Sequence, residues 1–189
     1  MTKKILLISL FSALSLFTTH AQETETVEKS VSGVQVGVLG AWIHHETRLA
    51  EQFTLRAEIG INAAGFISNP FTETVTYAFA PEFTIEPRYY YNISKRAEKQ
   101  KNTTANAANF ISLKTTYTPD WFVISNKDNV YVDNMISLVP TWGMRRNIGR
   151  SNFNYELGFG LGYEHVFHRY GGSDGGISVN LHARIGYRF

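Results

Sequence analysis

Hydrophobic and polar residues alternate along most of the chain after residue 33, and a period of two residues predicts β-strands rather than helices. Residues 53–62 show the pattern most clearly, with Phe, Leu, Ala and Ile on one face and mainly Thr, Arg, Glu and Asn on the other. The same alternation recurs in residues 153–163 and 178–189. Successive side chains of a strand point to opposite sides, so each predicted strand has one apolar and one polar face.

Less regular alternation predicts further strands at residues 34–43, 77–93, 111–117 and 136–144. Three prolines, Pro81, Pro87 and Pro140, fall on apolar faces of these runs. Because proline lacks a ladder donor, we expect bulges there, or places where the strand leaves its ladder. The strands total seven, whereas bacterial single-chain barrels have even numbers. An eighth strand could come from residues 22–33 or from a division of residues 109–135.

The same faces fit two opposite arrangements. In a soluble sandwich or a lipocalin-like barrel the apolar face points inward, whereas in an outer-membrane barrel it contacts lipid and the polar face fills the lumen. The apolar faces carry no charge, and the polar faces are rich in Gly and in charges of both signs, which favours the second arrangement. Aromatic residues near the strand ends, where membrane interfaces place them, also favour it: Trp42, Tyr89, Tyr91, Tyr117, Trp121, Phe122, Trp142, Tyr163, Phe167 and Tyr187.

The first 21 residues have the organisation of a secretory signal peptide. Lys3 and Lys4 precede an apolar stretch at residues 5–17, and Thr19-His20-Ala21 forms a small-x-small cleavage site. The apolar stretch is too short to span a membrane comfortably as a helix. We therefore predict a signal peptide at residues 1–21, a polar N-terminal lead-in at 22–32 and an outer-membrane β-barrel at 33–189.

The last predicted strand ends in an aromatic residue, Phe189, and its apolar face is formed by Leu181, Ala183, Ile185, Tyr187 and Phe189. This resembles the C-terminal assembly signal of outer-membrane barrel proteins. With cleavage, 168 residues remain, which suits an all-β, antiparallel, up-and-down barrel of eight transmembrane strands. The mature chain thus resembles the small eight-stranded barrels of the OmpA/OmpX type (outer membrane protein beta-barrel domain).

That resemblance implies Sec-type export to the outer membrane of a Gram-negative cell. It also implies periplasmic chaperones and the barrel-assembly machinery as partners, and outer-membrane lipid and lipopolysaccharide as surroundings of a monomer. The implied role is structural or interactive, in envelope integrity or in binding through loops. No catalytic or ligand-binding motif accompanies the resemblance.

Composition excludes several other classes of function. Without the signal peptide the chain has 16 basic and 16 acidic residues, so it lacks the excess positive charge of a nucleic-acid-binding protein. It has no Cys, which excludes disulfides, thiol nucleophiles and Cys-ligated metals.

Charged residues on the polar faces are nearly balanced in sign, and an eight-stranded barrel is just wide enough for side chains to fill it. Because buried charges require partners, we expect these residues to pair and close the lumen. The alternative is a narrow ion path along them. The set comprises Arg56, Glu58, Glu82, Glu86, Arg88, Lys114, Arg145, Glu156, Glu164, Arg184 and Arg188.

Histidines in predicted loops leave open a lipid-modifying enzyme, which would use a Ser–His pair with an acidic partner. One loop offers His165, His168, Ser173 and Asp174, and another offers His44, His45 and Glu46. No His-x-Ser motif like that of lipid A deacylases occurs, and adjacent histidines on an extended chain point apart. We therefore predict no enzyme activity, no catalytic or metal-binding residues and no cofactor.

If Phe189 lies on the periplasmic side, the sequence also assigns sides to the connections. Residues 63–76, 119–132 and 164–176 are then extracellular, and residues 147–152 form a short periplasmic turn. Residues 94–108 are a basic periplasmic segment, expected to be either a solvated long turn or a contact for anionic cell-wall or lipid groups.

Overall fold

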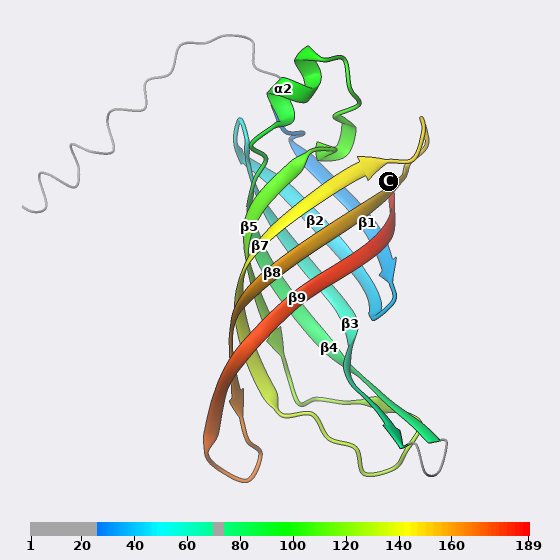
Figure 1. The fold of residues 1–189 in the computed structure, drawn as a ribbon, viewed down its shortest axis with the longest axis vertical. Coiled ribbons are helices and arrows are strands. Elements are labelled where there is room, and N and C mark those ends of the chain that lie inside the picture. The colour runs from blue at the N-terminus through cyan, green and yellow to red at the C-terminus, as the bar shows by residue number, and fades with distance from the viewer. Residues whose placement is uncertain (1–25, 70–73) are drawn as a thin grey trace, which may run out of the picture.

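The structure is a computed structural model that describes residues 26–69 and 74–189, and it is dominated by one antiparallel sheet that closes into a ring of eight strands (Figure 1). The predicted signal peptide lies outside the described residues. The strands of the ring are β1 (Ser30–Gly37), β2 (Gly40–Ala50), β3 (Phe53–Asn69), β4 (Thr74–Tyr89), β5 (Asn109–Thr118), β7 (Asn134–Asn147), β8 (Phe153–Phe167) and β9 (Ser173–Arg188). Pairing of β1 with β9, from Gly33 opposite Arg188 to Gly37 opposite Arg184, closes the ring.

The eighth strand comes from a region in which the sequence pattern predicted one strand and the structure has two. Residues 34–43 form a hairpin, in which β1 ends at Gly37 and β2 begins at Gly40, so the prediction of one continuous strand was wrong. Residues 109–135 supply only one strand of the ring, β5, and a two-residue strand β6 (Ile124–Ser125) that pairs with β4. β1 begins at Ser30, within the expected polar lead-in.

The three strand prolines cause no bulge. Pro81 and Pro87 lie in register opposite Ile61 and Leu55 of β3, and Pro140 lies opposite Leu113 of β5. On the other side of Pro87 and Pro140 the ladder is interrupted without a shift of register. Beside Pro81, β4 changes its partner from β5, at Phe83, to β6, at Phe79. The second expectation therefore holds: each strand leaves one of its two ladders at the proline, which has no N–H to donate. Between described strands, register shifts occur at residues 48–50 and 63–65.

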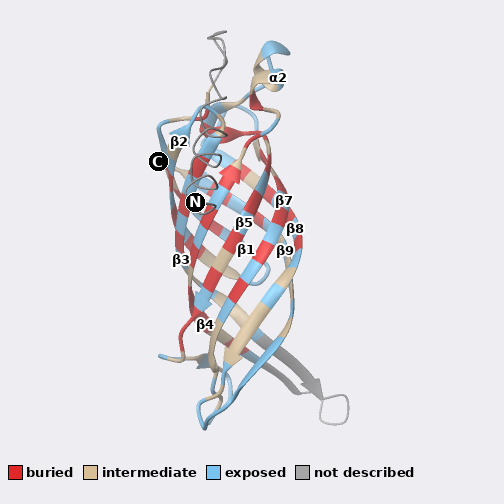
Figure 2. Cartoon of the chain, turned by 90° about the vertical axis from the view of Figure 1, so that its left-hand side faces the viewer, coloured by how far each residue is buried: buried red, intermediate tan, exposed pale blue. Residues whose placement is uncertain are grey.

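Buried and exposed residues alternate along the strands (Figure 2). The polar residues are the buried ones, as the sequence predicts for an outer-membrane barrel. Arg56 is 0% exposed, for example, while Ile59 on the opposite face of β3 is 61% exposed. The polar faces thus form the interior of the barrel and the apolar faces form its outer surface.

The two ends of the barrel differ in how they are covered. At the proximal end, where residues 26 and 189 lie, the connections include the tight turn at 51–52, the turn at 148–152 and the long segment 90–108. This segment contains α2 (Ile93–Glu98) and a 3-10 helix, η1 (Thr104–Asn106). The distal end has the turn at 168–172 and the connection at 119–133, and the turn at 38–39 faces the same way but lies partway along the barrel (Figure 1). The connections predicted for one side, at residues 119–132 and 164–176, thus lie toward the distal end, and those predicted for the other side lie at the proximal end. The connection predicted at residues 63–76 was wrong for most of its length, since 63–69 belong to β3 and 74–76 to β4.

Candidate functional site

The proximal half of the lumen contains a group of buried, oppositely charged side chains, which we call the lumen network. Its members are Glu46, Arg56, Glu58, Glu86, Arg88, Arg145, Glu156 and Arg184, each at most 4% exposed. They come from strands all around the ring, because every inward position faces the same narrow space. Four arginines face four glutamates, so the formal charges of the network balance.

Glu156 on β8 is the centre of the network. Arg88 donates to both of its carboxylate oxygens, at 3.0 and 2.9 Å, in the bidentate geometry that strengthens an arginine–carboxylate pair. Arg145 donates through Nε at 2.9 Å, and the Arg56 guanidinium lies 3.7 Å away. The ring of His182 is 3.4 Å from the same carboxylate. Arg88 also pairs with Glu86 at 2.7 Å.

A second cluster of charges surrounds Glu58 on β3. Its carboxylate accepts hydrogen bonds from Arg56 and, at 3.0 and 3.2 Å, from Arg184. Gln35 on β1 accepts from Arg56 at 2.7 Å. The Arg184 guanidinium also lies 3.7 Å from the centre of the Trp42 ring, a cation–π contact.

Glu46 on β2 connects the network to the segment that covers the proximal end. It accepts hydrogen bonds from Arg145 at 3.0 Å, from the Tyr90 hydroxyl at 2.8 Å and from the Asn106 amide at 2.7 Å. The sequence pattern suggested a loop for Glu46 together with His44 and His45, whereas all three residues lie within β2. Glu46 is therefore a lumen residue that the predicted set omitted.

Residues 92–108, which we call the cap, fold back over the proximal end of the barrel. Residues 105–108 are at most 1% exposed, so this part of the basic segment is not the solvated turn considered above. Arg145 donates to the carbonyl oxygen of Ala105 at 3.0 Å. Glu28, beside β1, accepts from the Ala105 N–H at 2.6 Å and donates its own N–H to Asn106 at 2.8 Å.

Apolar side chains hold the cap from within. Val27, Tyr90, Ile93, Ala108 and Phe110 form a buried cluster beneath it. Ala105 and Asn106 adopt left-handed backbone angles, with φ of 54° and 58°, a conformation that costs free energy for residues other than Gly. The buried contacts of the cap offset that cost.

Glycines of the inner face leave room for large neighbours. A methyl group added at Gly60 would lie 2.3 Å from the Trp42 ring, and one at Gly158 would lie 2.3 Å from the His182 ring. At Gly143 it would lie 2.3 Å from Phe110. The Gly-rich polar faces of the sequence thus correspond to close packing of side chains inside the barrel.

Four predicted lumen residues lie outside the network. Glu82 accepts hydrogen bonds from the indole of Trp42 and from Asn62, and Arg188 lies 3.9 Å from Glu28 near the proximal rim. Lys114 and Glu164 line a cavity in the distal half of the lumen.

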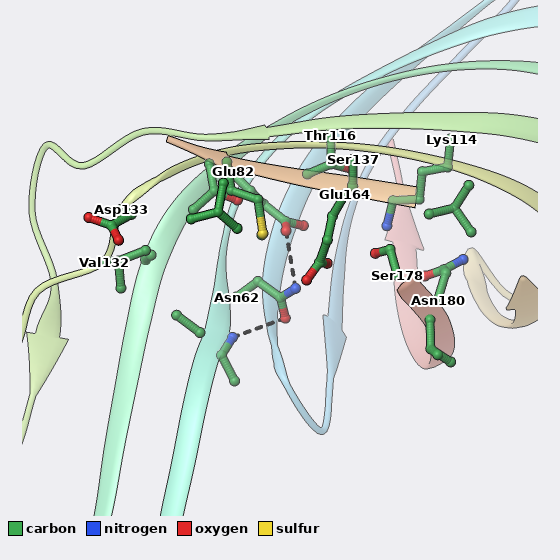
Figure 3. Close-up of a pocket in the computed structure, with 18 of the residues that line it drawn as sticks. Asn62, Glu82, Lys114, Thr116, Val132, Asp133, Ser137, Glu164, Ser178 and Asn180 are labelled. Atoms are coloured by element: carbon green, nitrogen blue, oxygen red, sulfur yellow. Dashed lines mark hydrogen bonds between the residues drawn. The ribbon is translucent and has the colours of Figure 1, made fainter. Parts of the chain in front are cut away.

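This distal cavity has a volume of about 420 Å³, within the range of small-molecule sites (Figure 3). In Figure 3 the side chains of Lys114, Glu82 and Glu164 point into it from different strands. A neighbouring space of about 430 Å³ shares Asn62, Ala63, Lys114, Val179 and Asn180 with it, so the two are parts of one space.

The structure separates the histidines that the sequence grouped together. His44 points into the lumen, while His45 points outward and hydrogen-bonds Ser32 at 2.7 Å, as expected for neighbours on a strand. His165 lies in β8 rather than in a loop, where its ring packs against Phe167.

His168 in the β8–β9 turn has both ring nitrogens engaged by carboxylates. Nδ1 lies 2.8 Å from Asp133, and Nε2 lies 2.9 Å from Asp174. Hydrogen bonds to Asp133 and then to Asp174 raise the pKa of His168, and the bond to His168 lowers the pKa of Asp133. An imidazole with both nitrogens engaged by carboxylates has no free nitrogen with which to activate Ser173. The cluster instead joins the 119–133 connection to the β8–β9 turn.

The residues of the predicted assembly signal lie together on the outer face of β9. Leu181, Ile185, Tyr187 and Phe189 are exposed side chains there, with Ala183 between them. In the part of the chain that the structure describes, no group of three or more His, Asp or Glu residues is arranged to hold a metal ion. No helix in that part is long and apolar enough to cross a membrane.

Neither protein-family models nor curated protein sequences match this chain. Among solved structures, it is similar to a major outer membrane protein from Thermus thermophilus, with 10% sequence identity and a TM-score of 0.41. The similarity covers 85% of this chain and 98% of that one. A likeness at this identity and TM-score does not extend to function.

Proposed function

We propose that the protein is an integral outer-membrane barrel whose lumen is closed, and that its role is structural or involves binding through its distal loops. The observation that carries this proposal is the distribution of side chains across the wall. Arginines and glutamates are buried inside, while aliphatic side chains such as Val36, Ile43 and Ile59 are more than 60% exposed outside. Water would favour the reverse arrangement, and lipid favours this one.

Aromatic side chains support the membrane location. Phe53 stacks on Tyr89, and Phe153 packs edge-on against Tyr187, all in the proximal part of the outer wall. Trp121 of the 119–133 connection packs against Phe83 on the outside of the barrel, toward the distal end. Two aromatic groups separated by an aliphatic band match the two interfaces of a bilayer.

The contents of the lumen support closure. An ion crossing the proximal half would have to separate the Arg88–Glu156 and Arg145–Glu46 pairs and then displace the cap. Each pair is fully desolvated, so breaking it costs several kcal/mol. The narrow channel is therefore the weaker proposal. Closure of the sheet on itself also supports a monomer.

Cell fractionation and gel mobility test the proposal. Expressed with its leader, the protein is expected in the outer membrane, and an unheated sample should migrate differently from a boiled one because the closed barrel resists detergent. Recovery in the soluble periplasm with identical mobility before and after boiling would contradict the proposal.

A further inference from the structure

On one side, the wall of the barrel does not extend as far toward the distal end as it does elsewhere. The β1–β2 hairpin stops partway along the barrel, whereas β3 and β9 continue beyond it toward the distal end (Figure 1). The pairing of β9 with β1 ends where Gly37 lies opposite Arg184, but β9 pairs with β8 as far as Ser173. Residues 173–183 of β9 therefore have no partner strand on the β1 side. We call this gap the lateral notch.

The notch lies at the level of the apolar outer surface. Residues at the tip of the β1–β2 turn are Val38 and Leu39, 87% and 40% exposed, although turns normally carry polar residues. Along the free edge of β9, the outward side chains Ile177, Val179 and Leu181 are also exposed. An aliphatic turn beside an aliphatic strand face is suited to contact with the acyl chains of lipids.

The notch leads into the lumen. The space of about 430 Å³ described above is lined both by Val38 and Leu181, which face outward, and by Trp42 and His182, which face inward. It therefore passes through the wall and joins the distal cavity. The backbone groups of residues 173–183 on the β1 side of β9 border it and have no partner strand in the part of the chain that the structure describes. Such groups are costly in lipid unless a polar partner satisfies them.

Two charged side chains that line the distal cavity have no ion pair with any described residue. Lys114 is 8% exposed and, among the described residues, no hydrogen bond or ion pair engages its ammonium group. Glu164 also points into the cavity without an ion pair to any described residue (Figure 3). In the lumen network, by contrast, charges of both signs are paired. The Lys114 ammonium therefore faces the cavity rather than a protein anion, so the cavity favours a ligand that supplies a negative charge there.

We propose that the lateral notch and the distal cavity bind an amphiphile with a single acyl chain and a zwitterionic headgroup. The chain leaves through the notch between Val38 and Leu181 and lies against the outer wall. The headgroup stays in the cavity, with its negative centre at Lys114 and its positive centre at Glu164. This inference rests on the proposed membrane location of the barrel.

Quenching of Trp42, which lines the notch, tests the inference. The double variant Trp121→Phe and Trp142→Phe leaves Trp42 as the only tryptophan. The probe is lysophosphatidylethanolamine with a brominated acyl chain, titrated into refolded protein in neutral maltoside micelles. We expect saturable quenching, and Lys114→Met or Glu164→Gln should each raise the half-saturation concentration about tenfold or more because each removes a charge-assisted contact. The matched exposed variants Lys95→Met and Glu98→Gln on α2 should leave it unchanged.

A second probe separates the two charges. Brominated lysophosphatidylglycerol has the negative centre without the ammonium, so Lys114→Met should weaken its binding while Glu164→Gln should not. Lys114→Arg, which keeps the charge, should restore binding of both probes.

Quenching that rises linearly without saturation, or that is the same in wild type, Lys114→Met and Glu164→Gln, would overturn the site. Heat-shifted gel mobility of each sample shows that the barrel has folded. Folded protein without saturable quenching rejects the site alone, whereas absence of the gel shift in wild type rejects the membrane barrel itself.

Discussion

Glu156 is the residue on which most of the buried positive charge converges. Arg88, Arg145 and Arg56 all lie within 4 Å of its carboxylate. Glu156→Gln keeps the shape of the side chain but leaves these guanidinium groups without their shared anion, which should lower the free energy of unfolding by about 3–5 kcal/mol. Urea unfolding of the refolded barrel, followed by tryptophan fluorescence, measures this loss.

Glu98→Gln is the control for that measurement. Glu98 is exposed on α2, so its substitution should change the free energy of unfolding by less than about 0.5 kcal/mol. Equal stability of Glu156→Gln and Glu98→Gln would show that the network does not stabilise the barrel.

His168 should make the contact between two distal loops depend on pH. Its pKa is raised above 6.5, so its stabilising contribution is complete below pH 6.5 and is lost as pH rises through the raised value. The pKa of Asp133 is lowered below 3.8, so its contribution is present above pH 3.8 and is lost on acidification. The contact is therefore strongest between these two limits.

An NMR titration of the His168 imidazole checks this. Its midpoint should lie above 6.5, and both Asp133→Asn and Asp174→Asn should lower it. A midpoint at or below 6.5 in the wild-type protein would contradict the contact between the loops.

Where the strand period is unambiguous, the alternation alone indicates which residues face inward. Arg56, Glu58 and Glu156 lie in regular alternating runs, and the structure places them inside. Glu46 was missed because two adjacent histidines precede it and suggested a loop. Extending the β2 alternation through Trp42 and His44 would have placed Glu46 on the inner face.

Among the elements, the cap should contribute to stability through Asn106. This residue keeps a left-handed backbone while its side chain bonds Glu46 and the backbone of Glu28. Asn106→Ala removes both hydrogen bonds and leaves a buried carboxylate with fewer donors, so it should lower the free energy of unfolding by about 1–3 kcal/mol. Urea unfolding is again the measurement.

Asn129→Ala is a matched control, because Asn129 also has a left-handed backbone, with φ of 59°, but is exposed on the 119–133 connection. Its variant reports the conformational cost alone. If both variants lose the same stability, the hydrogen bonds of the cap add nothing.

The β1–β2 hairpin shows why the strand count could not be read from the sequence. A turn is usually marked by polar residues, but this one has Val38 and Leu39 at its tip, so the apolar pattern continues across it. The sequence did not predict the cap either, because its basic and polar residues are typical of a solvated loop. Its burial depends on Glu46, Arg145 and Glu28, which are distant in the sequence.

On the scale of the whole molecule, the closed all-β barrel followed from the period of two and from the neutral apolar faces. The notch and the cap did not, because they depend on how far each strand runs and on where one loop folds. Both features concern access to the lumen: the cap covers its proximal end, and the notch opens its distal half sideways.

The central claim is that this barrel spans a membrane while its lumen stays closed to ions. Single-channel recording in planar bilayers tests it most directly, with insertion verified by heat-shifted gel mobility of the same reconstituted protein. We expect a flat baseline current, because the paired charges around Glu156 and the cap obstruct the proximal half of the lumen. Reproducible conductance steps from the inserted wild-type protein would contradict the claim.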